Sequence, residues 1–353
     1  MFLDIYREKK VLLTGHTGFK GAWLATWLAQ IGSEVVGFSL NPITQPNLFE
    51  INGLSNIVKH YIGDIRDAQR LAKVVQQESP DIIIHFAAQS LVLESYQNPL
   101  ETFEVNALGT VNVLNAAVQS SNIAAVLVIT TDKVYENHEW CWGYKENDHL
   151  GGHDPYSASK AMAEIAAASY RRSFGASSGL CIATARAGNV IGGGDFAENR
   201  LLPDSMKSLM SKQKIELRNP RSVRPWMHVL DPLCGYLWLG SKMLSEGESF
   251  AQAWNFAPKD HIGITCQQVV ERVIDRWEEG DWIDVSEEAG PKEMNCLRLN
   301  GDKAAHELGW TPLYDWKDAV DATVDWFKLY HTGSNMFNFT AEQIHTYMKN
   351  FIY

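Results

Sequence analysis

The feature that most constrains the fold is an apolar run that ends in glycine and is followed at once by a helical segment. The run VLLTG, residues 11–15, suits a buried strand, and in FKGAWLATWLAQIG, residues 19–32, large apolar side chains recur at helical spacing. The alternation continues along the chain, as is typical of βαβ units. Further strands are expected at 34–40, 82–88, 124–131 and 179–192. The sequence therefore predicts an α/β fold with a Rossmann-type, doubly wound parallel sheet.

The regular alternation ends near residue 191. Three consecutive glycines, residues 192–194, and the basic loop LRNPRSVRPWMHV follow. A chain of 353 residues with 45% apolar residues is longer than one modest domain needs. We therefore expect residues 1–190 to form the Rossmann domain and residues 191–353 to form mainly a smaller C-terminal lobe that covers the ligand. Segments at about 225–260 are expected to return to the first domain.

Composition argues against several classes of partner. The formal net charge of −11 disfavours a general affinity for nucleic acid or for an anionic membrane. The N-terminal stretch MFLDIYREKK lacks the features of a secretory signal, and no apolar run reaches the roughly 18 residues of a membrane-spanning helix. We therefore expect a cytoplasmic protein. Its five cysteines are widely separated, so we expect reduced packing residues rather than disulfides or a metal site.

The first motif with chemical meaning is TGHTGFKG, in which Gly15, Gly18 and Gly21 lie between the first strand and its helix. Glycines permit a tight turn and let backbone N–H groups approach a pyrophosphate at the positive end of a helix. An ordinary βα turn could carry the same glycines, but the preceding strand and following helix favour a dinucleotide site. The second strand ends at Ser39, without an acidic residue for the ribose or a basic residue for a 2′-phosphate. This favours NAD over NADP.

The second motif is DPYSASK, which places Tyr156 and Lys160 four residues apart and therefore on one face of a helix. Such pairs also occur by chance on exposed helices. Here Thr131 ends an earlier strand, so a hydroxyl, a phenol and an ammonium are expected to converge on one substrate oxygen beside a nicotinamide. The ordinary pKa of tyrosine is about 10, and a neighbouring ammonium and a positive nicotinamide would favour the phenolate.

Several motifs in order along the chain resemble the extended short-chain dehydrogenase/reductase superfamily: GxxGxxG, GDIRD, HFAAQS, Asn106 in VNALGT, the strand-end Thr131, YxxxK and GNVIG. The resemblance covers essentially the full length. Within the superfamily, TTDKVYEN resembles the nucleotide-sugar 4,6-dehydratases, whose dTDP-glucose branch follows the threonine with Asp-Glu. This sequence has Asp132 and Lys133 there. That pair, with HEWCWGYKEND and RNPRSVRPWMHVLDPL, resembles the branch that acts on CDP-glucose and begins dideoxysugar biosynthesis for lipopolysaccharide O-antigens.

The resemblance implies NAD as cofactor and a nucleotide sugar, CDP-glucose, as substrate. It implies that carbon 4 is oxidised, that water is eliminated across carbons 5 and 6, and that hydride returns to carbon 6 to give a 4-keto-6-deoxy sugar. Tyr156 would remove the proton of the 4-hydroxyl, Thr131 would bind the same oxygen, and Lys160 would hold the phenolate and the ribose. The residues implied for cofactor binding are Gly15, His16, Thr17, Gly18, Phe19, Gly21, Ser39, Asp64, Ile65, Ala87, Ala88, Asn106, Tyr156 and Lys160.

The elimination step falls to Asp132 and Lys133. Asp132 is the candidate acid that protonates the departing 6-hydroxyl. Lys133 is either the base for the proton on carbon 5 or a cation that stabilises the enolate oxygen at carbon 4. The alternative without function is a solvent-facing charge pair in a loop. We favour a functional pair, because parallel sheets bind their ligands at the carboxyl ends of the strands.

Arginine forks suit diphosphate oxygens, and the basic loop supplies several. The residues expected to bind the substrate are Asn189, Arg200, Arg218, Arg224 and Arg298. Arg221 is expected to be exposed, and His85, in an apolar strand, is expected to be a hydrogen-bonded core residue. The resemblance also implies a homodimer, or a dimer of dimers, that forms through the helix carrying Tyr156 and the helix before it.

Other functions remain open at this point. A different nucleotide-sugar 4,6-dehydratase would carry the same catalytic residues. A 4-epimerase shares the fold, the threonine and YxxxK, but it needs no elimination acid, so Asp132 speaks against it. A non-catalytic NAD-binding sensor is disfavoured by the presence of Thr131, Tyr156 and Lys160 together, because binding alone needs no phenolate.

Overall fold

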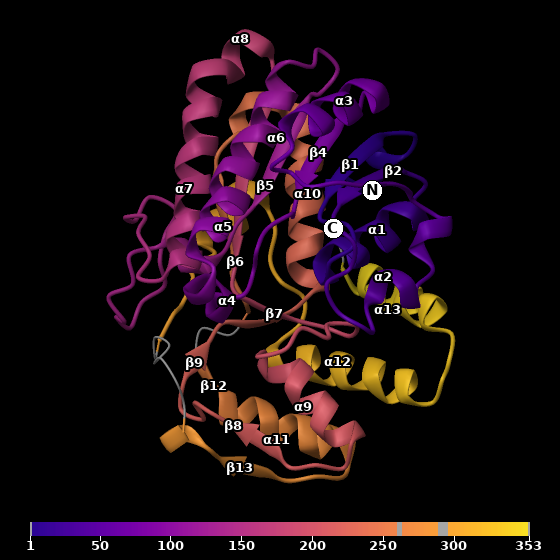
Figure 1. The fold of residues 1–353 in the computed structure, drawn as a ribbon, viewed down its shortest axis with the longest axis vertical. Coiled ribbons are helices and arrows are strands. Elements are labelled where there is room, and N and C mark those ends of the chain that lie inside the picture. The colour runs from indigo at the N-terminus through magenta and orange to yellow at the C-terminus, as the bar shows by residue number, and fades with distance from the viewer. Residues whose placement is uncertain (1, 260–262, 289–295, 352–353) are drawn as a thin grey trace.

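The computed structural model describes residues 2–259, 263–288 and 296–351. Its centre is a seven-stranded parallel sheet in the order β11-β6-β5-β4-β1-β2-β3 (Figure 1). The strands are β1 (Lys10–Thr14), β2 (Glu34–Ser39), β3 (Lys59–Ile62), β4 (Ile82–His85), β5 (Ala125–Ile129), β6 (Cys181–Ala187) and β11 (Ala253–Phe256). The order reverses between β1 and β4, which is where a doubly wound sheet opens a crevice for ligands. The predicted fold class is confirmed.

Alternate side chains of each strand enter two different cores. Val11 and Leu13 of β1 join a core with α1 (Phe19–Gln30) and α10 (Leu230–Glu246), whereas Leu12 joins a core with α3 (Ala68–Glu78), α6 (Gly109–Val118) and α7 (Pro155–Tyr170). Both faces of the sheet are therefore covered by helices, and this accounts for the continuous apolar runs of the strands.

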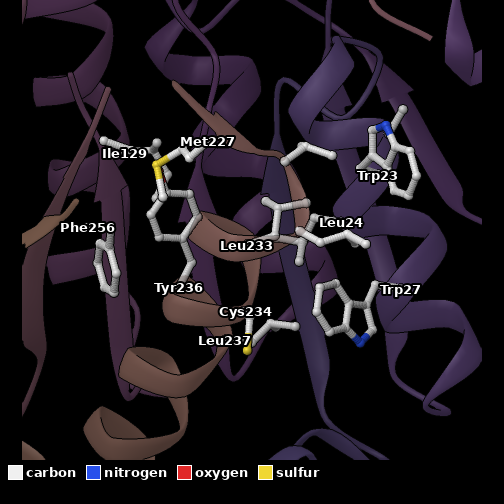
Figure 2. Close-up of a cluster of buried hydrophobic side chains, with 14 of the residues drawn as sticks. Trp23, Leu24, Trp27, Ile129, Met227, Leu233, Cys234, Tyr236, Leu237 and Phe256 are labelled. Carbon is white, nitrogen blue, oxygen red and sulfur yellow. The ribbon is translucent and has the colours of Figure 1, made fainter. Parts of the chain in front are cut away.

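Large aromatic side chains fill the core between the sheet, α1 and α10. Figure 2 shows Trp23 and Trp27 of α1 beside Leu233 and Leu237 of α10, with Tyr236 and Phe256 further along the same layer. All six side chains are fully buried. The helical spacing of the two tryptophans in the sequence therefore reflects packing against the sheet.

The predicted strand at 179–192 is wrong in one respect. β6 ends at Ala187, and β7 (Asn189–Ile191) pairs in parallel with β10 (Trp226–His228) in a separate sheet. At the break, a side chain on Gly188 would collide with the ring of Pro225. The chain therefore leaves the main sheet at this glycine, close to the predicted ligand-binding edge. The third strand, β3, was not predicted from the sequence.

The smaller lobe lies below the carboxyl ends of the sheet in Figure 1. It contains α9 (Leu201–Met210), α11 (Cys266–Trp277) and short strands, namely β8 (Ile215–Leu217), β9 (Val223–Arg224), β12 (Ile264–Thr265) and β13 (Trp282–Asp284). Two bidentate ion pairs, Arg272 with Asp321 and Arg276 with Asp325, join α11 to α12 (Trp316–His331). The lobe is thereby fixed to the rest of the chain.

The last helix, α13 (Met336–Asn350), returns to the Rossmann domain, where the ring of Tyr347 lies 5.9 Å from that of Trp27. The remaining helices are α2 (Leu48–Ile51), α4 (Val92–Gln97), α5 (Pro99–Phe103) and α8 (Ala176–Ser178). None of the helices in the described ranges is both long and apolar enough to cross a bilayer.

Candidate active site

The end of β5 places two polar side chains at the edge of the sheet. Thr131 caps the short helix η4 (Asp132–Val134), and its hydroxyl accepts a hydrogen bond from the backbone N–H of Lys133 at 3.4 Å. The same hydroxyl donates to Oδ1 of Asp132 at 2.9 Å. Both Thr131 and Asp132 are buried. The turn that ends the strand therefore fixes the threonine and the aspartate relative to each other.

Asp132 has the properties of a proton donor. Its Oδ2 atom is buried and has no hydrogen-bond partner among the residues that the structure describes. Burial raises the pKa of its carboxyl above the ordinary value, against the opposing effects of Lys133, the Thr131 hydroxyl, Arg224 and Lys20. A buried carboxyl with one free oxygen and a raised pKa keeps its proton to a higher pH than an ordinary aspartate does.

Tyr156 and Lys160 lie in the first turns of α7. The helix begins with Pro155, and the N-cap Asp154 accepts a hydrogen bond from the N–H of Ser157 at 2.9 Å. Lys160 donates from Nζ to the carbonyl oxygen of Ile129, the last residue of β5, at 2.9 Å. The start of this helix is therefore tied to the strand that leads into Thr131, and the predicted catalytic residues come together.

The expected effect of Lys160 on Tyr156 is not found in the protein alone. Burial raises the pKa of Tyr156 to about 12, while a hydrogen bond with Thr131 and the charge of Arg200 oppose that rise. Burial also lowers the pKa of Lys160 to about 8, and Glu164 opposes this. In the protein alone, Thr131 and Arg200 are the groups that favour the phenolate, and the positive charge of a bound nicotinamide would favour it further.

The glycine turn is built as a close contact between β1, β4 and α1. Gly15 has φ +76°, and a side chain there would come within 2.7 Å of the backbone nitrogen of Ala87. A side chain on Gly21 would collide with the carbonyl oxygen of Gly15. Gly18 is the N-cap of α1, and no side chain in the described part of the chain caps this N-terminus. The backbone N–H groups of Phe19, Lys20 and Gly21, which precede the first helical hydrogen bond from Ala22 to Gly18, are thus available to an anion such as pyrophosphate.

The end of β2 offers a hydroxyl with a defined direction. Thr17 donates its hydrogen to the carbonyl oxygen of Leu40 at 2.9 Å, and its Oγ1 lies 2.8 Å from Oγ of Ser39. Because the single hydroxyl hydrogen of Thr17 is already used, Ser39 is the donor to Thr17. The oxygen of Ser39 is then left as an acceptor, which suits the hydrogen of a ribose hydroxyl and does not suit an unprotonated phosphate.

His16 does not present its ring to a ligand. The ring is fully buried, lies against Gly37, and has the rings of Phe49 and His60 at 5.3 and 5.8 Å. Burial lowers its pKa to about 4, and neither ring nitrogen has a hydrogen-bond partner within the described ranges. Any contribution of His16 to cofactor binding would therefore come from its backbone, which stays in the glycine turn.

The other predicted cofactor residues line the same edge. Asp64 and Ile65 follow β3, and Ala87 and Ala88 follow β4. Asn106 is buried and bridges two elements, because its side chain donates to the carbonyl oxygen of Gln89 and to the hydroxyl of Ser159, each at 2.9 Å. Asn106 thus ties the loop after β4 to the helix that carries Tyr156.

His85 is a hydrogen-bonded core residue. Its Nε2 lies 3.0 Å from the hydroxyl of Thr110, which donates its own hydrogen to the carbonyl oxygen of Asn106. Nε2 must therefore be the donor, and Nδ1 accepts from Thr14 at 2.6 Å. Burial lowers the pKa of His85 to about 3, so it stays neutral.

The predicted substrate residues separate into inner and outer positions. Arg200 is at the centre, because it interacts with Tyr156 and donates to Asp195 at 3.0 Å and to Ser90 at 3.2 Å. Arg224 is buried on β9, and its positive charge favours the ionised form of Asp132.

Three further candidates lie around this centre. Arg298 donates to the carbonyl oxygen of Cys141 at 2.9 Å, and Asn189 is half-buried at the start of β7. Arg218 lies further out, with 43% of its side chain exposed, near Asp204.

Lys20 was not identified from the sequence. It follows Phe19 in the glycine motif, in the first turn of α1, where a cation is disfavoured by the helix dipole. Burial, Arg200 and Lys160 lower its pKa to about 8, and Asp132 opposes this. The signal that could have identified it is a lysine inside a glycine turn that already offers positive potential to a phosphate. Over the described residues, no group of three or more metal-ligating side chains is found.

Comparison with known proteins gives one family and several relatives. The family model described as GDP-mannose 4,6 dehydratase matches residues 12–323. The chain is 42% identical to the CDP-glucose 4,6-dehydratase of Salmonella typhimurium over 351 residues, which cover 98% of each chain. At this identity and coverage the two proteins share one fold throughout.

Two solved structures of other proteins are similar in fold. The UDP-glucose 4-epimerase of Thermotoga maritima, with UDP-glucose, has a TM-score of 0.79 at 18% identity and covers 91% of this chain and 99% of its own. The dTDP-glucose 4,6-dehydratase of Bacillus anthracis, in complex with NAD, has a TM-score of 0.76 at 21% identity and covers 94% of this chain and 99% of its own. Both likenesses concern the architecture.

Proposed function

The chain belongs to the GDP-mannose 4,6 dehydratase family, and from this membership we propose that it is an NAD-dependent CDP-glucose 4,6-dehydratase, a hydro-lyase that forms CDP-4-keto-6-deoxy-glucose. The observation that carries the proposal is the buried carboxyl of Asp132, held by Thr131 at the end of β5 beside Tyr156 and Lys160. Thr131, Tyr156 and Lys160 suffice for an oxidation at carbon 4. An elimination of water needs a proton donor in addition, and Asp132 supplies it. The 42% identical relative supplies the nucleotide and the sugar.

The residues of the Rossmann domain fit a dinucleotide. The uncapped N-terminus of α1 suits the pyrophosphate, and the acceptor oxygen of Ser39 suits a ribose hydroxyl. Bound NAD would take hydride from carbon 4 of the sugar and later return it to carbon 6. In the first step Tyr156 takes the proton of the 4-hydroxyl, and Thr131 holds the same oxygen. Lys160 contributes positive charge next to the phenolate.

The elimination follows from the ketone at carbon 4, which acidifies the hydrogen on carbon 5. We propose that Asp132 donates the proton that turns the departing 6-hydroxyl into water. Its raised pKa favours the protonated form that this step needs. Lys133, half-buried on η4, takes the proton from carbon 5 or stabilises the enolate oxygen. The carbon–oxygen bond at carbon 6 breaks, water leaves, and a double bond forms between carbons 5 and 6.

Substrate binding is assigned to side chains from both parts of the chain. We propose that residues 1–190, with the returning segments at about 225–260, bind NAD and that residues 191–353 form mainly the nucleotide-sugar lobe. We assign binding of the diphosphate and the sugar to Arg224, Arg298 and Arg200, together with Asn189 at the start of β7. Arg218 pairs with Asp204 and would contribute at the rim.

A homodimer, or a dimer of dimers, belongs to the same proposal. Leu100 on α5, Leu108 just before α6, and Met162 and Ile165 on α7 are large apolar side chains that are 47–72% exposed. Exposed apolar side chains on neighbouring helices are typical of an interface between copies. We also place the enzyme in the cytoplasm, where NAD and nucleotide sugars are available, at the start of dideoxysugar synthesis for an O-antigen.

Incubation of the purified enzyme with CDP-glucose and NAD tests the function. The expected product is a 4-keto-6-deoxy sugar, detected by its absorbance in alkali, with no net consumption of NAD. Parallel incubations with dTDP-, GDP- and UDP-glucose test the nucleotide. Formation of a carbon-4 epimer without loss of water would instead identify an epimerase, and no turnover with any of these sugars would favour a binding protein.

A further inference from the structure

A second buried carboxylate lies directly behind the catalytic helix. Glu164 is one helical turn after Lys160 on α7, and both side chains are buried. The hydroxyl of Thr130 donates to Oε1 of Glu164 at 2.5 Å, and the hydroxyl of Thr184 donates to Oε2 at 2.7 Å. The carboxylate therefore joins α7 to β6 and to the end of β5, next to Thr131.

Arg186 of β6 completes this site. Its Nη2 donates to Oε2 of Glu164 at 2.8 Å, and 3% of each side chain is exposed. Burial alone would raise the pKa of Glu164, but Arg186, Thr130 and Thr184 together lower it below the ordinary value. Glu164 therefore remains a charged carboxylate inside the protein. A buried ion pair is expensive to desolvate, so stability alone is a weak reason to keep one.

The network continues from Arg186 toward the substrate lobe. Nη1 of Arg186 donates to the hydroxyl of Tyr135 at 2.7 Å, and that hydroxyl donates to Oδ1 of Asn255 at 2.7 Å. The amide of Asn255 donates to the carbonyl oxygens of Tyr144 at 2.8 Å and of Asn300 at 3.2 Å. Arg186 is thus held from its other side, and Glu164 has a fixed position relative to β5, β6 and the segments that contain Tyr144 and Asn300.

The charges around Lys160 make Glu164 important. On α7, Glu164 and Tyr156 flank Lys160; from α1, Lys20 adds a second positive charge; and from β4, His85 faces it as a neutral ring. Asp132 on η4 acts electrostatically on both Lys20 and Tyr156, and it holds a proton more readily than an ordinary aspartate. Glu164 is therefore the negative charge that supports the ammonium of Lys160.

We propose that Glu164, held by Arg186, is a positioning residue that keeps Lys160 in its charged form and fixes the end of β5 against α7. This inference rests on the proposed function, because it concerns the lysine that assists Tyr156. The carboxylate touches neither the substrate nor the cofactor. It acts through Lys160 and through the segment from Thr130 to Thr131, and the hydrogen bond from Lys160 to Ile129 belongs to the same assembly.

The sign of the expected effect follows from the charge. Lys160 is charged below its pKa and neutral above it, and burial has already lowered that pKa to about 8. A negative charge nearby raises the pKa of an ammonium. Glu164→Gln keeps the shape of the side chain and removes its negative charge. Lys160 should therefore become neutral at a lower pH than in the wild type. Activity that needs the ammonium should then fall at lower pH than in the wild type.

The test compares the pH dependence of kcat for wild type, Glu164→Gln, Glu164→Asp and Glu78→Gln. Glu78 is a matched control, because it is also a buried, ion-paired carboxylate, but it pairs with Lys59 and with Lys10 at the amino end of β1. We expect the alkaline limb of Glu164→Gln to move down by about one pH unit, the lower end of the shift that a nearby opposite charge typically causes. In Glu164→Asp the alkaline limb should lie between those of Glu164→Gln and wild type. In Glu78→Gln it should lie at the wild-type pH.

The titration of Lys160 is also measured without substrate, from the ε-carbon shift of ¹³C-lysine-labelled enzyme. Lys160→Arg and Lys20→Arg identify the two signals, because both lysines titrate near pH 8. A lower pKa of Lys160 in Glu164→Gln supports the proposal even if CDP-glucose is not the substrate. An unchanged pKa and an unchanged alkaline limb would overturn it, and a loss of kcat at all pH values with an unmoved limb would reduce Glu164 to a structural role.

Discussion

Lys160 donates a hydrogen bond from Nζ to the carbonyl oxygen of Ile129 at 2.9 Å. Ile129 ends β5, and Thr131 and Asp132 follow within the next turn. The bond therefore joins the helix that supplies the phenol to the strand end that supplies the hydroxyl and the acid. The arrangement of all these groups depends on two neighbouring βα units, and each can be tested separately.

The first prediction concerns the phenol. Tyr156→Phe should fold and bind CDP-glucose nearly normally, but kcat should fall by orders of magnitude because no group of the chain then takes the proton of the 4-hydroxyl. The measurement is steady-state turnover beside binding by calorimetry. A variant that keeps more than about a tenth of wild-type kcat, a barrier change of about 1.4 kcal/mol, would contradict the assignment.

The second prediction concerns the affinity for the cofactor. Ser39 offers a neutral oxygen to the ribose, and a hydrogen bond to a neutral group contributes about 1 kcal/mol where a charge-assisted one contributes about 1.5–3 kcal/mol. We expect activity that responds to added NAD after dialysis, and a several-fold lower Kd for NAD in Ser39→Asp. Ser39→Thr, which keeps a hydroxyl, is the control. Stoichiometric NAD that survives extensive dialysis of the wild type would argue against this.

Much of this site could be predicted from the sequence, because its residues are local to motifs. At Gly15 and Gly21 a side chain would collide with the backbone, so only glycine fits there. Tyr156 and Lys160 share a helix face because they are four residues apart. The strands at β1, β2, β4 and β5 likewise followed from apolar runs. These features depend on few residues that are close in the chain, so one sequence is enough to identify them.

The parts that were wrong or missed depend on residues far apart in the sequence. The ring of His16 turns into a buried space beside Gly37 and Phe49, and the predicted strand at 179–192 is broken between β6 and β7, where Gly188 meets Pro225. Glu164 and Arg186 belong to no sequence motif, because their role depends on the ion pair that they form across 22 residues of the chain. These features depend on packing between residues that are far apart in the sequence, and such packing cannot be predicted from the spacing of residues in a motif.

The third prediction concerns pH and stability at a buried carboxyl outside the active site. Oδ1 of Asp231 on α10 accepts hydrogen bonds from Leu313 at 2.7 Å and from Tyr347 of α13 at 2.8 Å. Burial raises the pKa of Asp231 to about 7 in the folded protein, above its ordinary value of 3.8. The folded state therefore favours the proton, and the stability that this contributes is lost as the pH rises toward 7.

Asp231→Asn should remove this dependence, because the amide keeps the acceptor oxygen and cannot ionise. The unfolding free energy of the variant relative to wild type should rise between pH 4 and pH 8 by about 1–4 kcal/mol, from 1.36 kcal/mol for each unit by which the pKa differs. Urea unfolding at both pH values measures it. Equal differences at the two pH values would mean that Asp231 stays charged in the folded protein.

The fourth prediction concerns the diphosphate. Arg224 is buried on β9, so a guanidinium there can bind two phosphate oxygens at once, which an ammonium cannot do. Arg224→Lys should raise KM for CDP-glucose about tenfold or more with a smaller change in kcat. Arg221→Lys, at an exposed position of the same loop, is the control and should change KM little. If both variants behaved alike, Arg224 would not be a diphosphate ligand.

The last prediction concerns Asp132 and Lys133, whose work begins after carbon 4 is oxidised. Asp132→Asn or Lys133→Met should spare hydride transfer and slow elimination, because neither residue takes the first proton. A single turnover should then build up absorbance at 340 nm from the reduced cofactor, together with a 4-keto hexose that keeps its 6-hydroxyl. Wild-type enzyme should show little of either.

The pH dependence of elimination separates the two roles of Lys133. A general base must lose its proton, so the elimination rate would rise with pH if Lys133 is the base. A cation that stabilises the enolate must keep its proton, so the rate would then fall at high pH. We expect the rise, because the proton on carbon 5 needs an acceptor and Asp132, with its raised pKa, serves as the donor. Incorporation of solvent deuterium at carbon 5 reports the same step. Elimination at the wild-type rate in Lys133→Met, without a rise at 340 nm, would place the lysine outside the chemistry.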